Sequence, residues 1–287
     1  MNPLISLTNK ICKPPVHPFN LQKDGVKTYA EWQYERGADT VRFFTARYPV
    51  PELFAGKYVL DMGCGAAGKS LSFLTMGADR VVGVDIVPAY EEEAMALAAR
   101  LGLDGRFRFL CADASRLPFP DSTFDTIIMN DFMEHTADPE ATLREALRLV
   151  RPGGKICINF PPYGHPYGAH MSDLIYMPWV HLFLSERTLC RDYRTLAQAL
   201  PDGDARVRLR ITTDENGRDA IGYINKMTLR RFKKLLASLS LTPLYYKEVP
   251  LRPFLAPLAA LPLLKEVFVK MAVCVLSKDG DIPKESV

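Results

Sequence analysis

Short apolar runs and amphipathic segments alternate along the middle of the chain. The apolar runs predict strands at residues 58–62, 80–85, 106–111, 125–130 and 155–160. Apolar residues at helical spacing predict helices between them, at residues 67–76, 88–101 and 138–150. This alternation predicts an α/β fold, doubly wound and Rossmann-like, with helices on both faces of a mostly parallel sheet. Such sheets bind ligands at the carboxyl ends of their strands.

The pattern differs on either side of this core. Residues 1–25 have no clear period and are expected to form an irregular arm, whereas residues 28–48 predict one or two amphipathic helices. Residues 161–226 predict a cap inserted after the fifth strand, in which the alternation of Arg206, Arg208 and Arg210 suggests an added strand. A basic helix at 228–240 and strands near 244–249 and 270–276 follow. We therefore expect an arm with helices at 1–50 and one domain at 51–287. Within that domain, residues 161–226 are expected to form a cap on the side where a substrate would bind.

Composition narrows the class of protein without naming a partner. The chain has 287 residues, 48% of them hydrophobic, and a formal charge of only +3, so neither disorder nor strong attraction to nucleic acid is expected. Its six cysteines form no CxxC pair and are interpreted as buried thiols in a reducing compartment. The sequence shows no export signal, and no apolar run reaches the roughly 20 residues that span a bilayer. A cytoplasmic protein without a transmembrane segment is expected.

A glycine-rich loop after the first predicted strand matches two nucleotide-binding patterns. Residues 63–70, GCGAAGKS, satisfy both GxGxxG and GxxxxGKS. Asp61 lies two residues before the first glycine, where a carboxylate would repel a phosphate. It would instead hold the ammonium of an amino acid moiety, such as that of S-adenosylmethionine (AdoMet). In this interpretation Lys69 is an exposed residue early in a helix.

Two further acidic residues follow predicted strands. Asp85 ends the second strand, where a carboxylate can accept hydrogen bonds from ribose hydroxyls, although that feature suits NAD equally well. Asp113 follows the third strand, where its side chain or the N–H of Ala114 can meet an adenine edge. Asp113 is therefore the element that discriminates AdoMet from NAD, and three acidic strand ends in succession are hard to obtain by chance.

These segments together resemble the ordered motifs of class I AdoMet-dependent methyltransferases, in particular the group that includes small-molecule and quinone-biosynthesis enzymes. The resemblance is carried by VLDMGCG at 59–65, GVD at 83–85, CADA at 111–114, LPFPDSTFD at 117–125 and LVRPGG at 149–154.

The resemblance implies a seven-stranded sheet whose last strand, at 270–276, is antiparallel. It also implies the residues that contact AdoMet, or its product S-adenosylhomocysteine. The methionine moiety would lie against Asp61, Gly63 and Gly65, the ribose and adenine against Asp85, Ile86, Asp113 and Ala114, and the reacting end above Asn130.

The residues that would touch the acceptor follow the fourth and fifth strands. His135, His165 and His170 are candidate general bases, which are needed only where the attacking atom must lose a proton. His135 in the Glu134–His135 pair would otherwise only shape the donor site, as in related enzymes. Cys12 and His17 lack further ligands nearby in the sequence, so no metal is expected.

The expected acceptor is a small organic molecule methylated on oxygen, with carbon and nitrogen as alternatives. The apolar segments 176–184 and 251–264 would suit a lipophilic acceptor, a dimer face, contact with a membrane surface or simple packing. The segment NFPPY at 159–163 departs from the NPPY motif of base-modifying enzymes, which argues against nucleic acid. An alternative of another class is a non-catalytic AdoMet-binding module.

Overall fold

The computed structural model describes residues 1–14 and 16–278, and the chain divides into two compact units. One, here called the sheet unit, comprises Lys27–Phe160, Lys233–Lys247 and the chain from Ala272. The other, here called the helical unit, comprises Met1–Val26, Pro161–Phe232 and Glu248–Met271. Each unit is described by itself.

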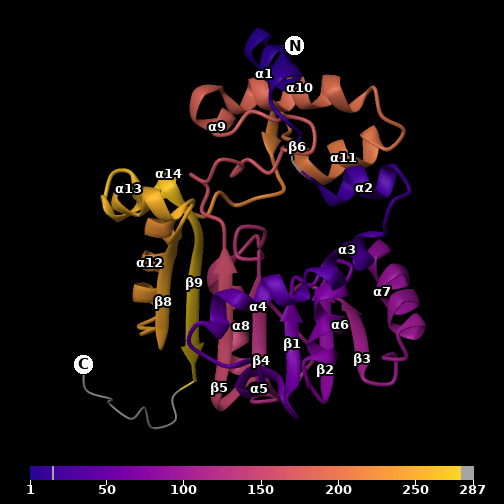
Figure 1. Ribbon diagram of the computed structural model, residues 1–287, viewed down its shortest axis with the longest axis vertical. Helices are drawn as coiled ribbons and strands as arrows, with labels where there is room; N and C mark the ends of the chain where they lie inside the picture. Colours follow the sequence, from indigo (N-terminus) through magenta and orange to yellow (C-terminus); the bar gives the residue numbers. More distant parts are fainter. Residues whose placement is uncertain (15, 279–287) are drawn as a thin grey trace. The chain divides into compact units, whose positions relative to one another are not determined.

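A seven-stranded sheet organises the fold, with strand order β3-β2-β1-β4-β5-β9-β8 (Figure 1). Its parallel strands are β1 (Tyr58–Met62), β2 (Arg80–Asp85), β3 (Phe107–Cys111), β4 (Phe124–Asn130) and β5 (Val150–Phe160). β9 (Val269–Ser277) is antiparallel to β5, and β8 (Tyr245–Pro250) forms the edge. This confirms the predicted doubly wound fold with seven strands.

The order of the strands reverses beside β1. β2 and β4 both pair with β1, so the chain leaves β1 in one direction and later returns on its other side. The carboxyl ends of β1, β2 and β4 consequently meet at the switch point where doubly wound folds bind ligands.

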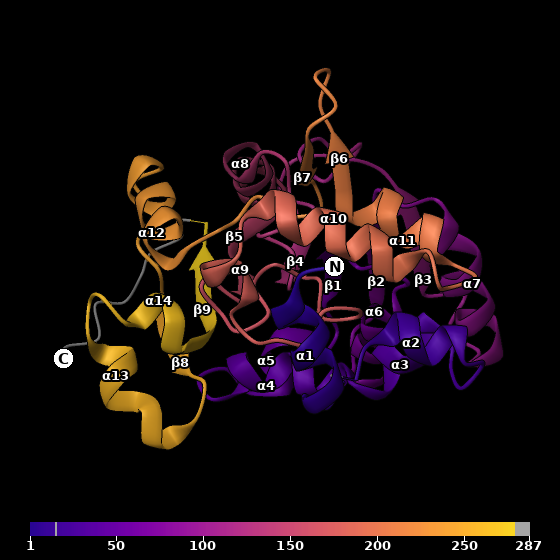
Figure 2. The same ribbon diagram turned by 90° about the horizontal axis from the view of Figure 1, so that it is seen from above.

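Helices cover both faces of this sheet, and in Figure 2 α4 and α6 lie on one face with α8 on the other. Their bounds are α3 (Tyr29–Glu35), α4 (Gly37–Thr45), α5 (Val50–Phe54), α6 (Gly68–Thr75), α7 (Ala89–Arg100), α8 (Pro139–Leu149) and α12 (Leu229–Ser238). Local signals define several starts: the Asp138 carboxylate accepts from two N–H groups of α8, and Thr28 with Glu31 forms a capping box on α3.

The helical unit has its own hydrophobic core. Its elements are α1 (Pro3–Ile11), α2 (Pro18–Lys23), α9 (Val180–Phe183), α10 (Glu186–Ala197), α11 (Gly203–Arg210), the hairpin β6 (Ile211–Thr213) with β7 (Asp219–Ile221), η1 (Pro253–Leu255), α13 (Ala256–Ala260) and α14 (Lys265–Phe268). Ile5 of α1 packs in this core with Val180, Leu189 and Tyr193, so the first helix is part of the unit.

Two expectations about this unit were wrong. The first 25 residues are not an irregular arm, because α1 and α2 occupy most of them, each with a proline in its first turn and an N-cap side chain, Asn2 or His17. Arg206, Arg208 and Arg210 lie in α11 and not in a strand. Arg206 and Arg210 are four residues apart and both buried, so they occupy one face of the helix.

A buried carboxylate explains why those two arginines face inward. Asp173 is fully buried and accepts hydrogen bonds from the Tyr193 hydroxyl at 2.7 Å and from Nη1 of Arg206 at 3.2 Å. Nε of Arg210 lies 3.2 Å from its other oxygen. Arg206 also donates to the side chain of Asn20 in α2, which ties the N-terminal helices to α10 and α11.

Among the described residues no helix is long and apolar enough to cross a membrane. Four of the six cysteines are buried as expected, but Cys111 is exposed at the end of β3 and Cys12 is only partly covered.

Candidate active site

The glycine turn follows the central strand β1 and is held against β2. The N–H groups of Gly63 and Cys64 both donate to the carbonyl of Val84, at 2.8 and 2.9 Å. Gly63 and Gly65 have φ angles of +78° and +58°, a region that glycine adopts without strain. A Cβ atom on Gly63 would lie 2.0 Å from the Phe132 ring, so no larger residue fits there. Gly63 is half-buried and Gly65 is buried, and the side chains of Phe132 and Gln33 lie where a Cβ would be, so close packing around the turn requires glycine as well as its φ angles do.

Asp61 ends β1 beneath this turn and is almost completely buried, with 3% of its surface exposed. The Ser70 hydroxyl donates to its Oδ2 at 2.6 Å. Burial raises its pKa to about 6, and the nearby charge of Asp85 adds to the rise, whereas the Ser70 bond and Lys69 oppose it. A cationic group beside Asp61 would favour the ionised form, because opposite charges lower a carboxyl pKa. The electrostatics of this position suit an ammonium and disfavour a phosphate.

Asp85 has a structural role that the sequence did not suggest. Its Oδ2 accepts from the N–H of Gly65 at 2.8 Å, and its Oδ1 accepts from the N–H of Val87 at 3.0 Å. Burial raises the pKa of Asp85, and these backbone donors counteract part of the rise. Each carboxylate oxygen has two acceptor sites, so Asp85 can brace the turn and still accept from a ligand hydroxyl.

The candidate adenine contacts come from the neighbouring strand ends. β2 pairs with β3 through Asp85 and Cys111, which places Asp113 and Ala114 just beyond the carboxyl end of β3. The exposed Asp113 accepts from the N–H of Ser115 at 2.8 Å, and Ala114 is buried. Ile86, the residue after β2, is 68% exposed.

The end of β4 holds a small polar network. Asn130 is buried and donates through Nδ2 to the Asp131 carboxylate at 2.9 Å. Nζ of Lys69 lies 3.3 Å from the same carboxylate oxygen. The expectation that Lys69 is an exposed residue was therefore wrong: only 17% of its side chain is exposed, and it neutralises Asp131.

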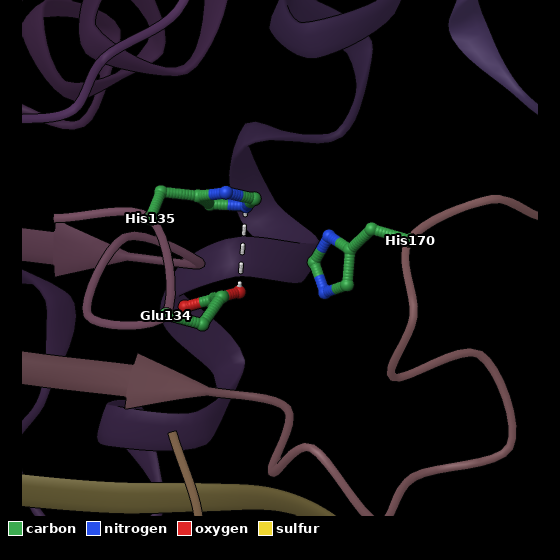
Figure 3. A group of neighbouring side chains, drawn as sticks. All are labelled: Glu134, His135 and His170. Atoms are coloured by element: carbon green, nitrogen blue, oxygen red, sulfur yellow. Dashed lines mark ion pairs between the residues drawn. The ribbon is translucent and has the colours of Figure 1, made fainter. Parts of the chain in front are cut away.

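Glu134 and His135 follow this network (Figure 3). Glu134 is 3% exposed, and neither of its carboxyl oxygens has a hydrogen-bond partner among the described residues. Nε2 of His135 lies 3.8 Å from Oε1 of Glu134, beyond hydrogen-bond distance but close enough for a charged pair. Burial raises the pKa of Glu134 well above its usual value, and the Asp131 charge raises it further. Glu134 is thus held as a neutral acid or as the partner of a protonated His135.

Sequence reasoning missed the contribution of α3. Gln33 is buried and bridges the turn, because its Nε2 donates to the carbonyl of Cys64 and its Oε1 accepts from the N–H of Gly68, both at 3.2 Å. The N–H of Ala30 also donates to Glu93 of α7 at 2.6 Å. A capping box marked the start of this helix, but no local signal pointed to a partner 31 residues away.

His165 and His170 belong to the helical unit. His165 is half-buried, and its Nδ1 accepts from the N–H of Tyr167 at 3.2 Å. His170 has a φ of +53° and its ring lies edge-on to Tyr223, with centroids 6.3 Å apart. Tyr163 lies against His181, and burial raises the pKa of the Tyr163 hydroxyl.

Comparison with known proteins agrees with this geometry. Residues 60–158 match the family model described as a methyltransferase domain. This segment runs from β1 into β5 and contains every candidate donor residue and His135, but neither of the other two histidines.

Curated relatives match part of the chain. The chain is 34% identical over 107 residues to 27-O-demethylrifamycin SV methyltransferase of Amycolatopsis mediterranei, which covers 37% of this chain and 39% of that protein. It is 32% identical to norajmaline N-methyltransferase of Rauvolfia serpentina, over 36% of this chain and 35% of the relative. The match to the ubiquinone/menaquinone biosynthesis C-methyltransferase UbiE of Salmonella arizonae is 25% identical, over 59% and 69%. The chain thus spans less than two fifths of the first two relatives.

Solved structures extend the likeness in fold. Geranyl diphosphate C-methyltransferase from Streptomyces coelicolor, in complex with S-adenosylhomocysteine, has a TM-score of 0.52 over 87% of this chain and 80% of that one, at 14% identity. The [4+2]-cyclase SpnF has a TM-score of 0.54 over 87% and 83%, at 17% identity. Since the second of these proteins is named a cyclase, the fold by itself does not define the reaction.

The strand order, the glycine turn and the family match point to one class of protein. Residues 60–158 match the methyltransferase domain model, and they lie in a sheet with Rossmann-like strand order.

Proposed function

We propose that this chain binds AdoMet and transfers its methyl group to a small organic acceptor. The observation that carries the proposal is the glycine turn between the buried carboxyl group of Asp61 and the half-buried carboxyl group of Asp85, which accepts from the N–H of Gly65. Asp61 would hold the ammonium, and Asp85 with Ile86 the ribose. Asp113 and Ala114 would contact the adenine, with Asn130 below the reacting end. When bound, AdoMet supplies an activated methyl group that leaves a neutral thioether.

Calorimetric titration with AdoMet, S-adenosylhomocysteine, ATP and NADH tests this binding. Micromolar affinity for the first two and none for the others is expected. The opposite result, binding of ATP or NADH alone, would overturn the proposal. A non-catalytic AdoMet-binding module is the second candidate, because a cyclase shares this fold. It predicts donor binding with no methylated product from any acceptor.

We propose oxygen as the atom that is methylated. The relatives named above act, by their names, on oxygen, nitrogen and carbon, so they leave the atom open. The support comes from His135, whose Nε2 faces the buried Glu134 carboxyl. A hydroxyl must lose its proton on methylation, and an imidazole can accept it, with Glu134 balancing the resulting charge.

Replacement of His135 tests the choice of atom. With a hydroxyl acceptor, His135→Gln should lower kcat by about 10²- to 10⁴-fold, the usual effect of losing a general base. Donor affinity should be unchanged. Methyl-labelled AdoMet with mass spectrometry would locate the new methyl group, and a methylated carbon or nitrogen would refute oxygen.

His165 and His170 are the further candidates for contact with the acceptor. They lie in the helical unit with Tyr163 and Tyr167, outside the segment that matches the family model. We propose that residues 161–226 form the acceptor-side cap of the enzyme. The apolar segments 176–184 and 251–264 would suit a lipophilic acceptor.

A further inference from the structure

Exposed hydrophobic side chains are concentrated in the helical unit. Of the thirteen large hydrophobic residues that are exposed in the described part of the chain, eleven belong to this unit, and only Ile86 and Leu101 belong to the sheet unit. Isolated exposed apolar residues need no explanation, but this concentration in one unit does.

The most regular group of exposed residues is on α1. Leu4, Leu7 and Ile11 are 37%, 56% and 71% exposed, and their i, i+3, i+7 spacing places them along one side of the helix. We call these three residues the α1 stripe. It is distinct from the packed side of α1, where Ile5 is completely buried.

The orientation of α1 is fixed by polar anchors and not by the stripe. Asn9 donates through Nδ2 to the carbonyl of Leu174 at 2.6 Å, and its Oδ1 accepts from the N–H of Tyr176 at 2.9 Å. Ile5 packs in the same core as Val180 of α9. Turning the stripe inward would break these bonds and expose Ile5, so α1 presents apolar residues on the outside of a folded unit.

A second apolar group lies on the neighbouring helix α9. Leu182 and Phe183 are 48% and 68% exposed, whereas Val180 of the same helix is buried in the core that Ile5 shares. Both views place α1 close to α9 (Figures 1 and 2). The two helices therefore add exposed apolar side chains around one common core.

The exposed charges nearest the stripe are lysines. Residues 1–22 contain Lys10 and Lys13 and no Asp or Glu, and residues 174–185 contain no charged residue apart from a histidine. Lys23 is paired with Asp24, and Asp192, whose carboxylate accepts from the N–H of Asn2, is buried. Lys10 and Lys13 are exposed, and Lys10 borders the stripe because it follows Leu7 by three residues. This local excess of cations contrasts with a net charge of only +3 for the whole chain.

We propose that α1 with α9 docks the protein on an anionic lipid bilayer. Short helices with leucines on one side and lysines beside them bind membranes by inserting the apolar side between the headgroups while the cations meet anionic lipids. A second copy of the chain fits less well, because a two-fold interface would bring the lysines of both copies to the same surface, and residues 1–22 supply no carboxylate to balance them. The surface is therefore complementary to a partner that is both apolar and anionic.

Sedimentation of the full chain with vesicles tests the proposal. Binding to phosphatidylcholine vesicles that contain phosphatidylglycerol should exceed binding to phosphatidylcholine alone, and it should weaken as salt is raised. Leu7→Ser with Ile11→Ser should lower the affinity at least about tenfold. Lys10→Gln with Lys13→Gln should lower it by about fivefold for each lysine, without removing any apolar contact.

Leu101→Ser in the sheet unit is the matched control and should bind as the unchanged chain does, since it also removes a partly exposed leucine. Circular dichroism and thermal melting would establish that each variant is folded. Equal binding to both kinds of vesicle, or no loss in the stripe variant, would overturn the proposal. So would a dimer in sedimentation velocity that the stripe variant abolishes, because the stripe would then bind a second copy.

Discussion

At the scale of single residues, Asp61 is the group whose chemistry can be followed most directly. Its pKa lies near 6 instead of the usual 3.8 because it is buried. Between these two values the folded state holds a proton that the unfolded chain releases. The contribution of Asp61 to stability is therefore present at low pH and lost as the pH rises through about 6.

Donor binding should show the opposite dependence. Only the ionised carboxylate attracts an ammonium, so the affinity for AdoMet should be constant above pH 6 and fall by up to about tenfold for each unit below it. Calorimetry between pH 5 and 8 would measure this. Asp61→Asn should bind weakly at every pH and flatten the profile. A profile that is unchanged in this variant would place the ammonium elsewhere.

Asp85 gives a second prediction about the donor. Asp85→Ala should weaken AdoMet binding by about 1.5–3 kcal/mol, the range expected on losing hydrogen bonds to a charged group. It should also lower the free energy of unfolding, because the N–H groups of Gly65 and Val87 lose their acceptor. Asp79→Ala is the control, since the Asp79 side chain is 62% exposed and forms an ion pair with its exposed neighbour Arg80. Normal donor binding by Asp85→Ala would contradict the assigned role.

The sequence could place these carboxyl groups but not their neighbours. An acidic residue at a strand end keeps its position because the apolar run before it sets the strand. The partners of that residue depend on tertiary packing. Gln33 reaches the glycine turn from 31 residues upstream, and Lys69 turns back to Asp131. Neither contact can be predicted from the spacing of residues near it in the sequence.

At the scale of elements, the link between α3 and the glycine turn can be tested. Gln33→Ala would leave the N–H of Gly68 and the carbonyl of Cys64 buried without this partner, at a cost of about 1–3 kcal/mol in the free energy of unfolding. Urea denaturation would measure the cost, and the Kd for AdoMet should rise with it because the turn is less well held. Gln22→Ala, at an exposed position of α2, should change neither quantity. Equal stability of both variants would mean that the bridge is not formed.

Elements with an apolar pattern were predictable, whereas those organised by buried charge were not. The strands of the sheet were predicted from short apolar runs in the sequence. In α11, by contrast, Arg206 and Arg210 are buried on the inner face. Arginine is normally counted as an exposed residue, so the arginines at every second position suggested a strand with one exposed face. The structure places them in a helix. Pro3 and Pro18 likewise begin helices where they suggested an irregular arm.

The carboxylate that organises those elements carries its own prediction. Asp173→Ala should lower the free energy of unfolding of the helical unit by about 3–5 kcal/mol, because it leaves two buried guanidinium groups without their shared partner. Hydrogen exchange should show the loss of protection in α10 and α11. Asp204→Ala removes an exposed carboxylate of α11 and should have little effect. Unchanged protection in Asp173→Ala would show that the arginines are held by other contacts.

At the scale of the whole molecule, the division into two units separates the candidate donor residues from two of the candidate acceptor residues. Asp61, Asp85 and Asn130 are fixed at strand ends of the sheet unit, whereas His165 and His170 lie in the helical unit. The regular alternation of strands and helices in the sheet unit explains why its fold could be predicted, while the donor residues stay a prediction. The helical unit lies outside the segment that matches the family model, so no family motif was available from which to predict the acceptor.

From this division we predict that substitutions in the helical unit affect turnover without affecting the affinity for AdoMet. If residues 161–226 act on the acceptor, alanine at Tyr163, His165, Tyr167 or His170 should lower kcat and leave the Kd for AdoMet nearly unchanged. The physical reason is that side chains of a cap align the acceptor and exclude water, while the donor is held by strand ends that these changes do not touch.

Three measurements on the same four variants decide the matter: donor affinity by calorimetry, melting temperature, and turnover once an acceptor is known. Leu200→Ala, a partly buried residue packed against the core of the helical unit, serves as a control for stability alone. Loss of turnover in proportion to a lower melting temperature, as in this control, would assign the four side chains to packing. Loss of turnover at an unchanged melting temperature would assign them to the acceptor, because a residue that only supports the fold cannot slow the reaction while the fold keeps its stability.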